Sequence, residues 1–234
     1  MTLTTLGYAF IAGILPSFIW LYFILKEDAR HPEPRTLIAL SFIAGMVAVL
    51  FAIPLEQFAK ASLIGVFPVL TAWALIEETL KYVMAAAFIL WRPAVDEAPD
   101  YVIYMITVAL GFAAVENMFF LLTPLSDGLI ASSLFTGDVR FIGSTLLHVL
   151  ASASIGFALA FSTASRPIIR MAAAAGGLIL AIALHTAFNA LIISEGTSTT
   201  LAAVFLVWTA AVIFFAAFEV LKYFQYRNLP TNSY

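Results

Sequence analysis

Hydrophobic residues run along the chain in long stretches, separated by short polar or turn-forming segments. A helix that spans a bilayer needs about 20 mostly apolar residues, and about seven stretches of the chain meet this requirement. They lie at residues 5–25, 36–56, 66–91, 101–123, 141–163, 168–193 and 199–222. The pattern predicts an all-α fold, in which residues 1–234 form a single integral membrane domain, a polytopic transmembrane helical bundle.

Charged residues, Pro and Gly mark the breaks between these stretches. The clearest breaks are residues 26–35 and 92–100, whereas residues 123–140 form a longer mixed segment that could hold an interfacial or re-entrant helix. Residues 1–8 carry no Lys or Arg. The positive region of a signal peptide is therefore missing, and the first stretch is expected to be a span.

The composition also indicates a membrane protein. Hydrophobic residues make up 63% of the chain and charged residues 11%, against about 45–50% and 25% in soluble domains. The net charge of -3 gives no reason to expect nucleic acid as a partner. The chain has no Cys, which excludes disulfides, thiolate metal sites and cysteine nucleophiles.

The Lys and Arg residues predict an orientation, because cytoplasmic loops are enriched in them. With seven spans, eight of the 11 basic residues fall on one side: Lys26, Arg30, Arg35, Arg92, Arg166, Arg170, Lys222 and Arg227. Lys60 and Arg140 fall on the other side, and Lys81 lies inside a span. The N-terminus is therefore expected outside the cell and the C-terminus in the cytoplasm.

Four of the predicted spans contain polar residues that are costly in lipid. These residues are Glu77, Glu78 and Lys81 in the third span, Glu116 and Asn117 in the fourth, His148 in the fifth, and His185 and Asn189 in the sixth. A charge at the centre of a span costs about 2.5–3.5 kcal/mol on insertion scales. Such residues must face one another or a wet cavity, and they mark functional sites by default.

Helical spacing brings several of these residues onto shared faces. Glu77 and Lys81 are four residues apart and can pair, which would leave Glu78 as the unpaired carboxylate. His185 and Asn189 have the same spacing, and so do Ser144, His148 and Ser152 on the fifth span. Ser152, Gly156 and Ala160 form a stripe of small residues, which allows membrane helices to approach closely.

Each feature taken alone has a structural explanation. The Glu–Lys pair could be a structural ion pair, Asn189 a hydrogen bond between helices, and Arg140 a side chain that reaches the head groups. The combination on four spans favours a functional site. An enzyme, a proton-coupled transporter and a non-catalytic membrane scaffold could all use it, although the chain lacks the inverted repeats that transporters favour.

The order of the motifs resembles a known family. Residues 77–81 read EExxK, residues 112–117 read FxxxEN, and residues 185–189 read HxxxN, with Arg140, Ser144 and His148 between them. This series resembles the PrsW family of bacterial intramembrane proteases, within the superfamily of CAAX prenyl endopeptidases and bacteriocin-processing membrane proteases. The segment His31-Pro32-Glu33-Pro34-Arg35 is also similar to that family. Prenyl endopeptidases instead carry EExxxR and FxxxH, which argues against a prenylated substrate.

The resemblance implies a location in the bacterial cytoplasmic membrane, an activity, a substrate and roles for the site residues. The expected reaction is hydrolysis of a membrane-anchored protein near its extracytoplasmic boundary, with an anti-sigma factor in site-one proteolysis as the implied substrate. Glu77 and Glu78 would supply the general base, assisted by Glu116 or His148. His185 and Asn189 would stabilise the oxyanion. Lys81, Asn117, Arg140 and Ser144 are expected to support the site.

Metal dependence stays open at this point. Carboxylates and imidazoles are Zn²⁺ ligands, and Glu78, Glu116, His148 and His185 are the set expected if a metal binds. The chain lacks HExxH, the strongest sequence sign of a zinc peptidase, which favours a glutamic-type, metal-independent route.

Overall fold

The computed structural model describes residues 3–27, 31–126, 143–194 and 197–227. These residues form seven α-helices and no strands. The helices are α1 (Leu3–Glu27), α2 (Arg35–Ser62), α3 (Val66–Phe88), α4 (Ala98–Ser126), α6 (Thr145–Phe161), α7 (Pro167–Ile193) and α8 (Thr197–Tyr226). Each helix coincides with one of the apolar stretches, so the predicted all-helical membrane fold is confirmed.

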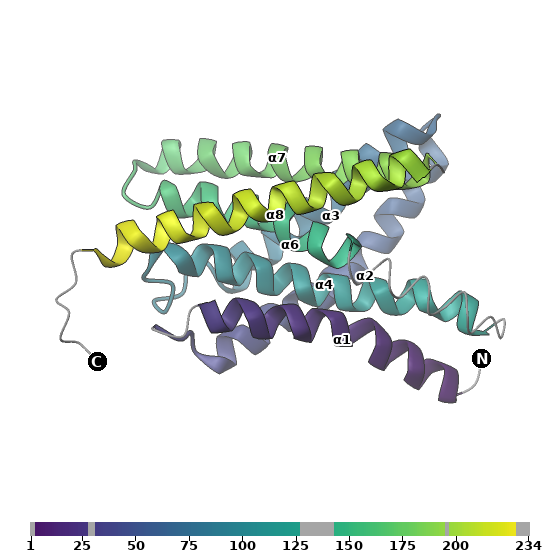
Figure 1. The fold of residues 1–234 in the computed structure, drawn as a ribbon, viewed down its shortest axis with the longest axis horizontal. Helices are drawn as coiled ribbons and strands as arrows, with labels where there is room; N and C mark the ends of the chain where they lie inside the picture. The colour runs from purple at the N-terminus through teal and green to yellow at the C-terminus, as the bar shows by residue number, and fades with distance from the viewer. Residues whose placement is uncertain (1–2, 28–30, 127–142, 195–196, 228–234) are drawn as a thin grey trace.

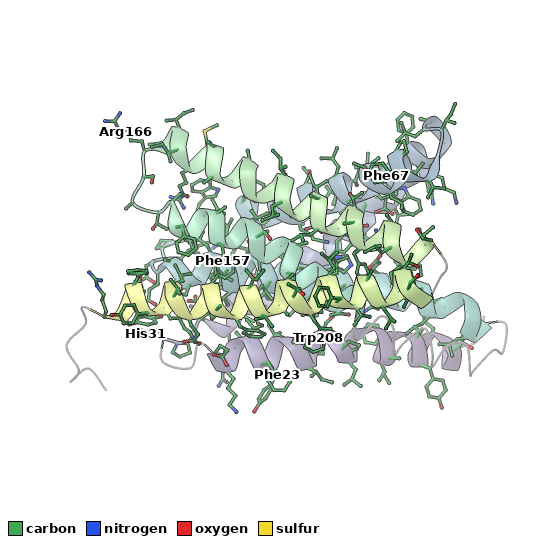
Figure 2. The ribbon with its side chains drawn as sticks, turned by 45° about the horizontal axis from the view of Figure 1, so that its top comes forward. Phe23, His31, Phe67, Phe157, Arg166 and Trp208 are labelled. Carbon is green, nitrogen blue, oxygen red and sulfur yellow. The ribbon has the colours of Figure 1, made fainter. Side chains whose placement is uncertain are left out.

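Five of these helices, α1, α2, α4, α7 and α8, are long and apolar enough to cross a membrane. The described part of α6 has 17 residues, and α3 carries three charged side chains in its middle turns. Phe23, Phe67 and Trp208 are more than half exposed on the outside of the bundle (Figure 2). Apolar side chains in such positions are ordinary where the surrounding solvent is lipid.

Several helix boundaries differ from the predicted ones, among them the ends of α2 and α4. Helix α2 continues past residue 56, through the polar residues that end its apolar pattern, to Ser62. It continues because backbone hydrogen bonds within a helix do not require apolar side chains. Helix α4 extends to Ser126, and residues 127–142, including Arg140, lie outside the described residues.

Helix α4 forms the centre of the bundle. Every residue from Tyr101 to Ala114 is buried, because α1, α2 and α6 all pack against this helix. Helix α7 packs on α6 and α3, and α8 lies against α6 and α7. The two chain ends lie at opposite ends of the bundle (Figure 1), as an odd number of crossings requires.

Glycine allows α2 and α4 to approach closely. A Cβ atom on Gly45 would lie 1.9 Å from the carbonyl oxygen of Val108, and one on Gly111 would lie 1.9 Å from that of Phe42. Either contact is closer than atoms can come, so only Gly fits at both positions. The expected stripe on α6 has the same effect, since a Cβ on Gly156 would lie 2.7 Å from the Cα of Val102 on α4.

Candidate active site

Three charged side chains of α3 form the centre of the site. Glu77, Glu78 and Lys81 are all buried, and they lie where α3 faces α4, α6 and α7. The spacing of three and four residues places both carboxylates near the ammonium group on one side of the helix. A buried ionic cluster of this size needs partners from the neighbouring helices, and these are present.

Glu78 accepts a hydrogen bond from each of three partners. Its Oε1 atom accepts from Nζ of Lys81 at 2.7 Å and from Nδ1 of His185 at 2.8 Å. Its Oε2 atom accepts from the Ser152 hydroxyl at 3.0 Å. One carboxylate therefore joins α3, α6 and α7. A buried carboxylate with this many donors is well compensated, and it acts as a fixed anion that orients its neighbours.

Lys81 bridges the carboxylates and a histidine. Its Nζ atom lies 2.7 Å from Nδ1 of His148 and 3.6 Å from Oε2 of Glu77, and it sits over the Phe112 ring at 4.3 Å. The expected Glu77–Lys81 ion pair is present, but it is the longer contact. The expectation that Glu78 is the unpaired carboxylate is wrong, because Lys81 donates its hydrogen bond to Glu78.

The partners of the two imidazoles define their tautomers. Lys81 is a donor, so His148 accepts at Nδ1 and donates from Nε2 to Oε2 of Glu116 at 2.8 Å. Glu78 is an acceptor, so His185 donates from Nδ1 and keeps a lone pair on Nε2. A carboxylate thus orients each ring through one nitrogen. This is the arrangement that surrounds metal-binding histidines in proteins.

Glu77 has the least compensated oxygen of the site. Its Oε2 atom is buried and has no hydrogen-bond partner within the described part of the chain. It lies 3.9 Å from Nδ1 of His148 and 3.9 Å from Nε2 of His185. Ligand atoms bound to one Zn²⁺ at about 2.0–2.2 Å lie roughly 3.3–3.6 Å apart. The Glu77 oxygen would have to move only slightly closer to each imidazole nitrogen to reach that spacing.

The donor atoms suit a divalent cation by type, and they lie close together. One atom from each of Glu77, Glu78, His148 and His185 lies within 4.8 Å of the others. The sequence analysis expected Glu116 in this set and did not include Glu77. In the structure Glu77 belongs to the set, and Glu116 instead accepts a hydrogen bond from Nε2 of His148. Both oxygens of Glu78 already accept hydrogen bonds. The donor atoms that remain for a metal are therefore Oε2 of Glu77 and Nε2 of His185. Nδ1 of His148 would join them only in place of its hydrogen bond from Lys81.

A cavity of about 360 Å³ opens onto this cluster. It lies among α2, α3, α4 and α7, with Ser144 at its edge. Its polar lining comes from Glu56, Glu77, Glu116, Ser144, His185 and Asn189, and Trp73, Phe112, Phe119, Phe120 and Phe188 supply aromatic walls. The cavity is large enough for a side chain and a stretch of backbone, and its polar groups come from several of the helices around it.

Among the described residues, two predicted supporting residues, Lys81 and Asn117, do not line this cavity. Asn117 is buried and donates a hydrogen bond to Oγ1 of Thr145 at 3.0 Å, which ties α4 to α6. Arg140 lies outside the described residues. The predicted residues Glu116, Ser144 and Asn189 do line the cavity.

The sequence analysis did not identify Glu56 as a site residue. It is half-buried on α2, lines the cavity, and its backbone carbonyl accepts a hydrogen bond from the Trp73 indole at 3.1 Å. Glu56 falls at the edge of the second apolar stretch, where a carboxylate is ordinary. The one sequence signal that could have identified Glu56 is its position two residues after Pro54, within a helix that continues past the apolar stretch.

The fold and the site together define a class of protein: a helical membrane protein with a buried carboxylate and histidine centre that opens to a cavity. The model of the PrsW family, described as intramembrane metalloproteases, matches residues 33–218. The chain therefore belongs to the PrsW family.

Curated relatives agree with this assignment. The chain is 28% identical to Protease PrsW of Geobacillus kaustophilus over 149 residues, which cover 62% of the chain and 63% of the relative. It is 32% identical to Protease PrsW of Oceanobacillus iheyensis over 118 residues, which cover 48% and 53%. The match thus spans less than two thirds of either relative. No solved structure is significantly similar to the chain.

Proposed function

We propose that the protein is an intramembrane endopeptidase that hydrolyses a peptide bond of a membrane-anchored protein. The observation that carries this proposal is that Glu77 and His185 line a cavity, while Nδ1 of His148 lies 3.9 Å from the same Glu77 oxygen that faces His185. Peptide hydrolysis needs an activated water, a proton acceptor and a group that stabilises the oxyanion. The site has residues suited to each of these tasks.

We further propose that the reaction depends on a divalent metal. Glu77 and His185 would hold it, because the unpartnered Glu77 oxygen and the free Nε2 lone pair of His185 match the ligand types of zinc hydrolases. Nδ1 of His148 would be the third ligand, in place of its hydrogen bond from Lys81. A bound Zn²⁺ would supply Lewis acidity and a nucleophilic water. Glu78 and Glu116 would orient the imidazoles, which is the usual role of carboxylates behind such ligands.

The remaining steps involve residues of the cavity wall. Glu116 lines the cavity with its side chain 21% exposed, so it would accept the proton of the attacking water and pass it to the leaving amine. Asn189, one helical turn after His185, would donate from its amide to the developing oxyanion. Lys81 would offset the negative charge of the carboxylates around it.

The orientation supports a site that faces the extracytoplasmic side. His148 lies three residues after the described start of α6, and His185 lies eight residues before the end of α7. The start of α6 and the end of α7 both lie toward the end of the bundle where α1 begins (Figure 1). Under the positive-inside rule that end is extracytoplasmic. The substrate would be cut near that boundary, and a single-span anti-sigma factor is the substrate class to test first.

The test is cleavage in proteoliposomes that hold the purified protein and a panel of single-span substrates. The wild type should cut at least one substrate, lose the activity to a chelator, and regain it with Zn²⁺. Glu77→Gln should be inactive but still capture the substrate in crosslinking. Unimpaired activity in Glu77→Gln would contradict the proposal. Proton flux without cleavage would instead indicate a transporter, and function of Glu77→Gln in cells would indicate a scaffold.

A further inference from the structure

A second cavity lies at the opposite end of the bundle from the active site. Its volume is about 300 Å³, and it is lined by the end of α3, the start of α4, the end of α6 and the start of α7. Tyr82, Trp91, Tyr101 and Arg170 give it polar groups, and Leu90, Leu159 and Met171 give it apolar ones. Figure 2 labels Arg166, the residue before α7, at this end of the bundle.

Arg170 has an unused donor in this cavity. Its terminal NH₂ group donates to the Tyr101 hydroxyl at 2.5 Å, and its guanidinium lies 5.0 Å from the Tyr101 ring centre and 5.6 Å from that of Trp91. Its Nε–H is buried and has no partner among the described residues. A buried donor on a charged group is costly to leave unpaired. A guanidinium held between rings is a preorganised site for a planar or phosphate anion.

The surroundings indicate which anion binds. The cavity has a mostly apolar lining and lies at the helix ends, the depth at which the head groups of a bilayer meet the acyl chains. Trp91, 72% exposed beside it, is the residue type that anchors at this depth. Most of the basic residues of the chain lie at this end, which the charge pattern assigns to the cytoplasm. Anionic lipids give that leaflet its negative surface potential.

We propose that this cavity binds an anionic phospholipid. The lipid phosphate would accept from Nε of Arg170, and the start of an acyl chain would lie along Leu159 and Met171. The start of α7, the positive end of that helix dipole, adds positive potential on the same side. The proposal concerns a site separate from the proposed catalytic centre, and it holds whether or not the protein cleaves peptides.

The test is native mass spectrometry of the full-length protein in detergent, titrated with phosphatidylglycerol or with phosphatidylcholine of the same acyl chains. The wild type should retain phosphatidylglycerol preferentially. Arg170→Gln should weaken that binding by about five-fold or more, since one basic residue near the membrane surface contributes about 1 kcal/mol. Arg92→Gln is the matched control, because it removes the same charge at the same end from a residue that donates to Phe88 and does not line the cavity.

Ser165→Glu is a second variant, which adds a negative charge to the cavity lining and keeps the test valid if Arg170→Gln does not fold. It should also weaken phosphatidylglycerol binding, while phosphatidylcholine binding stays unchanged. Equal retention of both lipids by the wild type would overturn the proposal. Equal losses of phosphatidylglycerol binding in Arg170→Gln and Arg92→Gln would overturn it too. They would indicate that the lipid is attracted by the positive charge of this end of the bundle and not by the cavity. Inorganic phosphate that competes as well as the lipid would show a free anion site instead.

Discussion

Glu77 and Glu78 are consecutive and both buried, yet their carboxylates have opposite surroundings. Glu78 accepts hydrogen bonds from three side chains on three helices, whereas Oε2 of Glu77 has no hydrogen-bond partner in the described part of the chain and faces two imidazoles. The two residues are therefore expected to respond differently to the same substitution. Glu78 should matter for the fold and Glu77 for the chemistry.

The first prediction compares Glu77→Gln with Glu78→Gln. Glu78→Gln leaves the buried ammonium of Lys81 poorly paired, and removing one partner of a buried ion pair costs about 3–5 kcal/mol. Glu77→Gln removes a carboxylate that is not fully satisfied, so stability should change little while metal binding and cleavage are lost. Thermal unfolding in detergent and metal content measured on the same samples check both results. A Glu77→Gln protein that melts far below the Glu78→Gln protein would contradict the assignment.

The second prediction concerns the ion pair of α3. Lys81→Met should be strongly destabilising, because it leaves Glu78 without its charged partner. The double variant Glu78→Gln/Lys81→Met should recover most of that loss, and Glu77→Gln/Lys81→Met should recover less. A double-mutant cycle on unfolding free energies measures both couplings. Stronger coupling to Glu77 would show that the 3.6 Å contact, and not the 2.7 Å contact, dominates.

The sequence predicted which residues meet but not how they pair. The spacing of apolar stretches located the helices, and the cost of charge in lipid singled out the cluster on α3, α4, α6 and α7. Residues three or four positions apart lie on the same helix face. The sequence therefore could not decide whether Lys81 pairs with Glu77 or with Glu78. That choice depends on where α6 and α7 place Ser152 and His185. Glu56 was missed because the end of an apolar stretch does not mark the end of a helix.

The third prediction tests the role of Glu116. If Glu116 orients His148 through its hydrogen bond and does not bind the metal itself, Glu116→Gln should lower metal affinity by about 10–100-fold without abolishing binding. This is the usual effect of replacing a residue that hydrogen-bonds to a metal ligand. Competition with a chelating dye of known affinity measures this effect. An alanine at Asn189 is the matched control, since that residue lines the cavity but is not a proposed ligand. If Asn189→Ala lowered metal affinity and Glu116→Gln did not, Asn189 and not Glu116 would support metal binding.

The fourth prediction concerns helix packing. Gly111→Ala should destabilise the protein by at least about 1–3 kcal/mol, the usual cost of overpacking, because its new Cβ would overlap the Phe42 carbonyl. Gly176→Ala is the control, since a Cβ there meets nothing within 4 Å. That variant should be neutral or slightly more stable, because Ala favours helix over Gly by about 1 kcal/mol. Melting temperatures of the two variants in one detergent give the comparison, and equal values would refute the packing argument.

The last prediction concerns the compartment that the site faces. Ser144 and Ile192 line the cavity near the start of α6 and the end of α7, whereas Ile169 lies at the start of α7 and is exposed. The chain contains no Cys, so single replacements by Cys report without background. If the N-terminal end of the bundle is extracytoplasmic, Ser144→Cys and Ile192→Cys should react with a membrane-impermeant maleimide added to intact cells, and Ile169→Cys should react only after the cells are opened.

Pretreating cells that carry Ser144→Cys with a peptide-like inhibitor should slow the labelling of that residue, since the inhibitor would occupy the same cavity. Labelling of Ile169→Cys in intact cells, with the other two protected, would place the active site on the cytoplasmic side and exclude an extracytoplasmic cut.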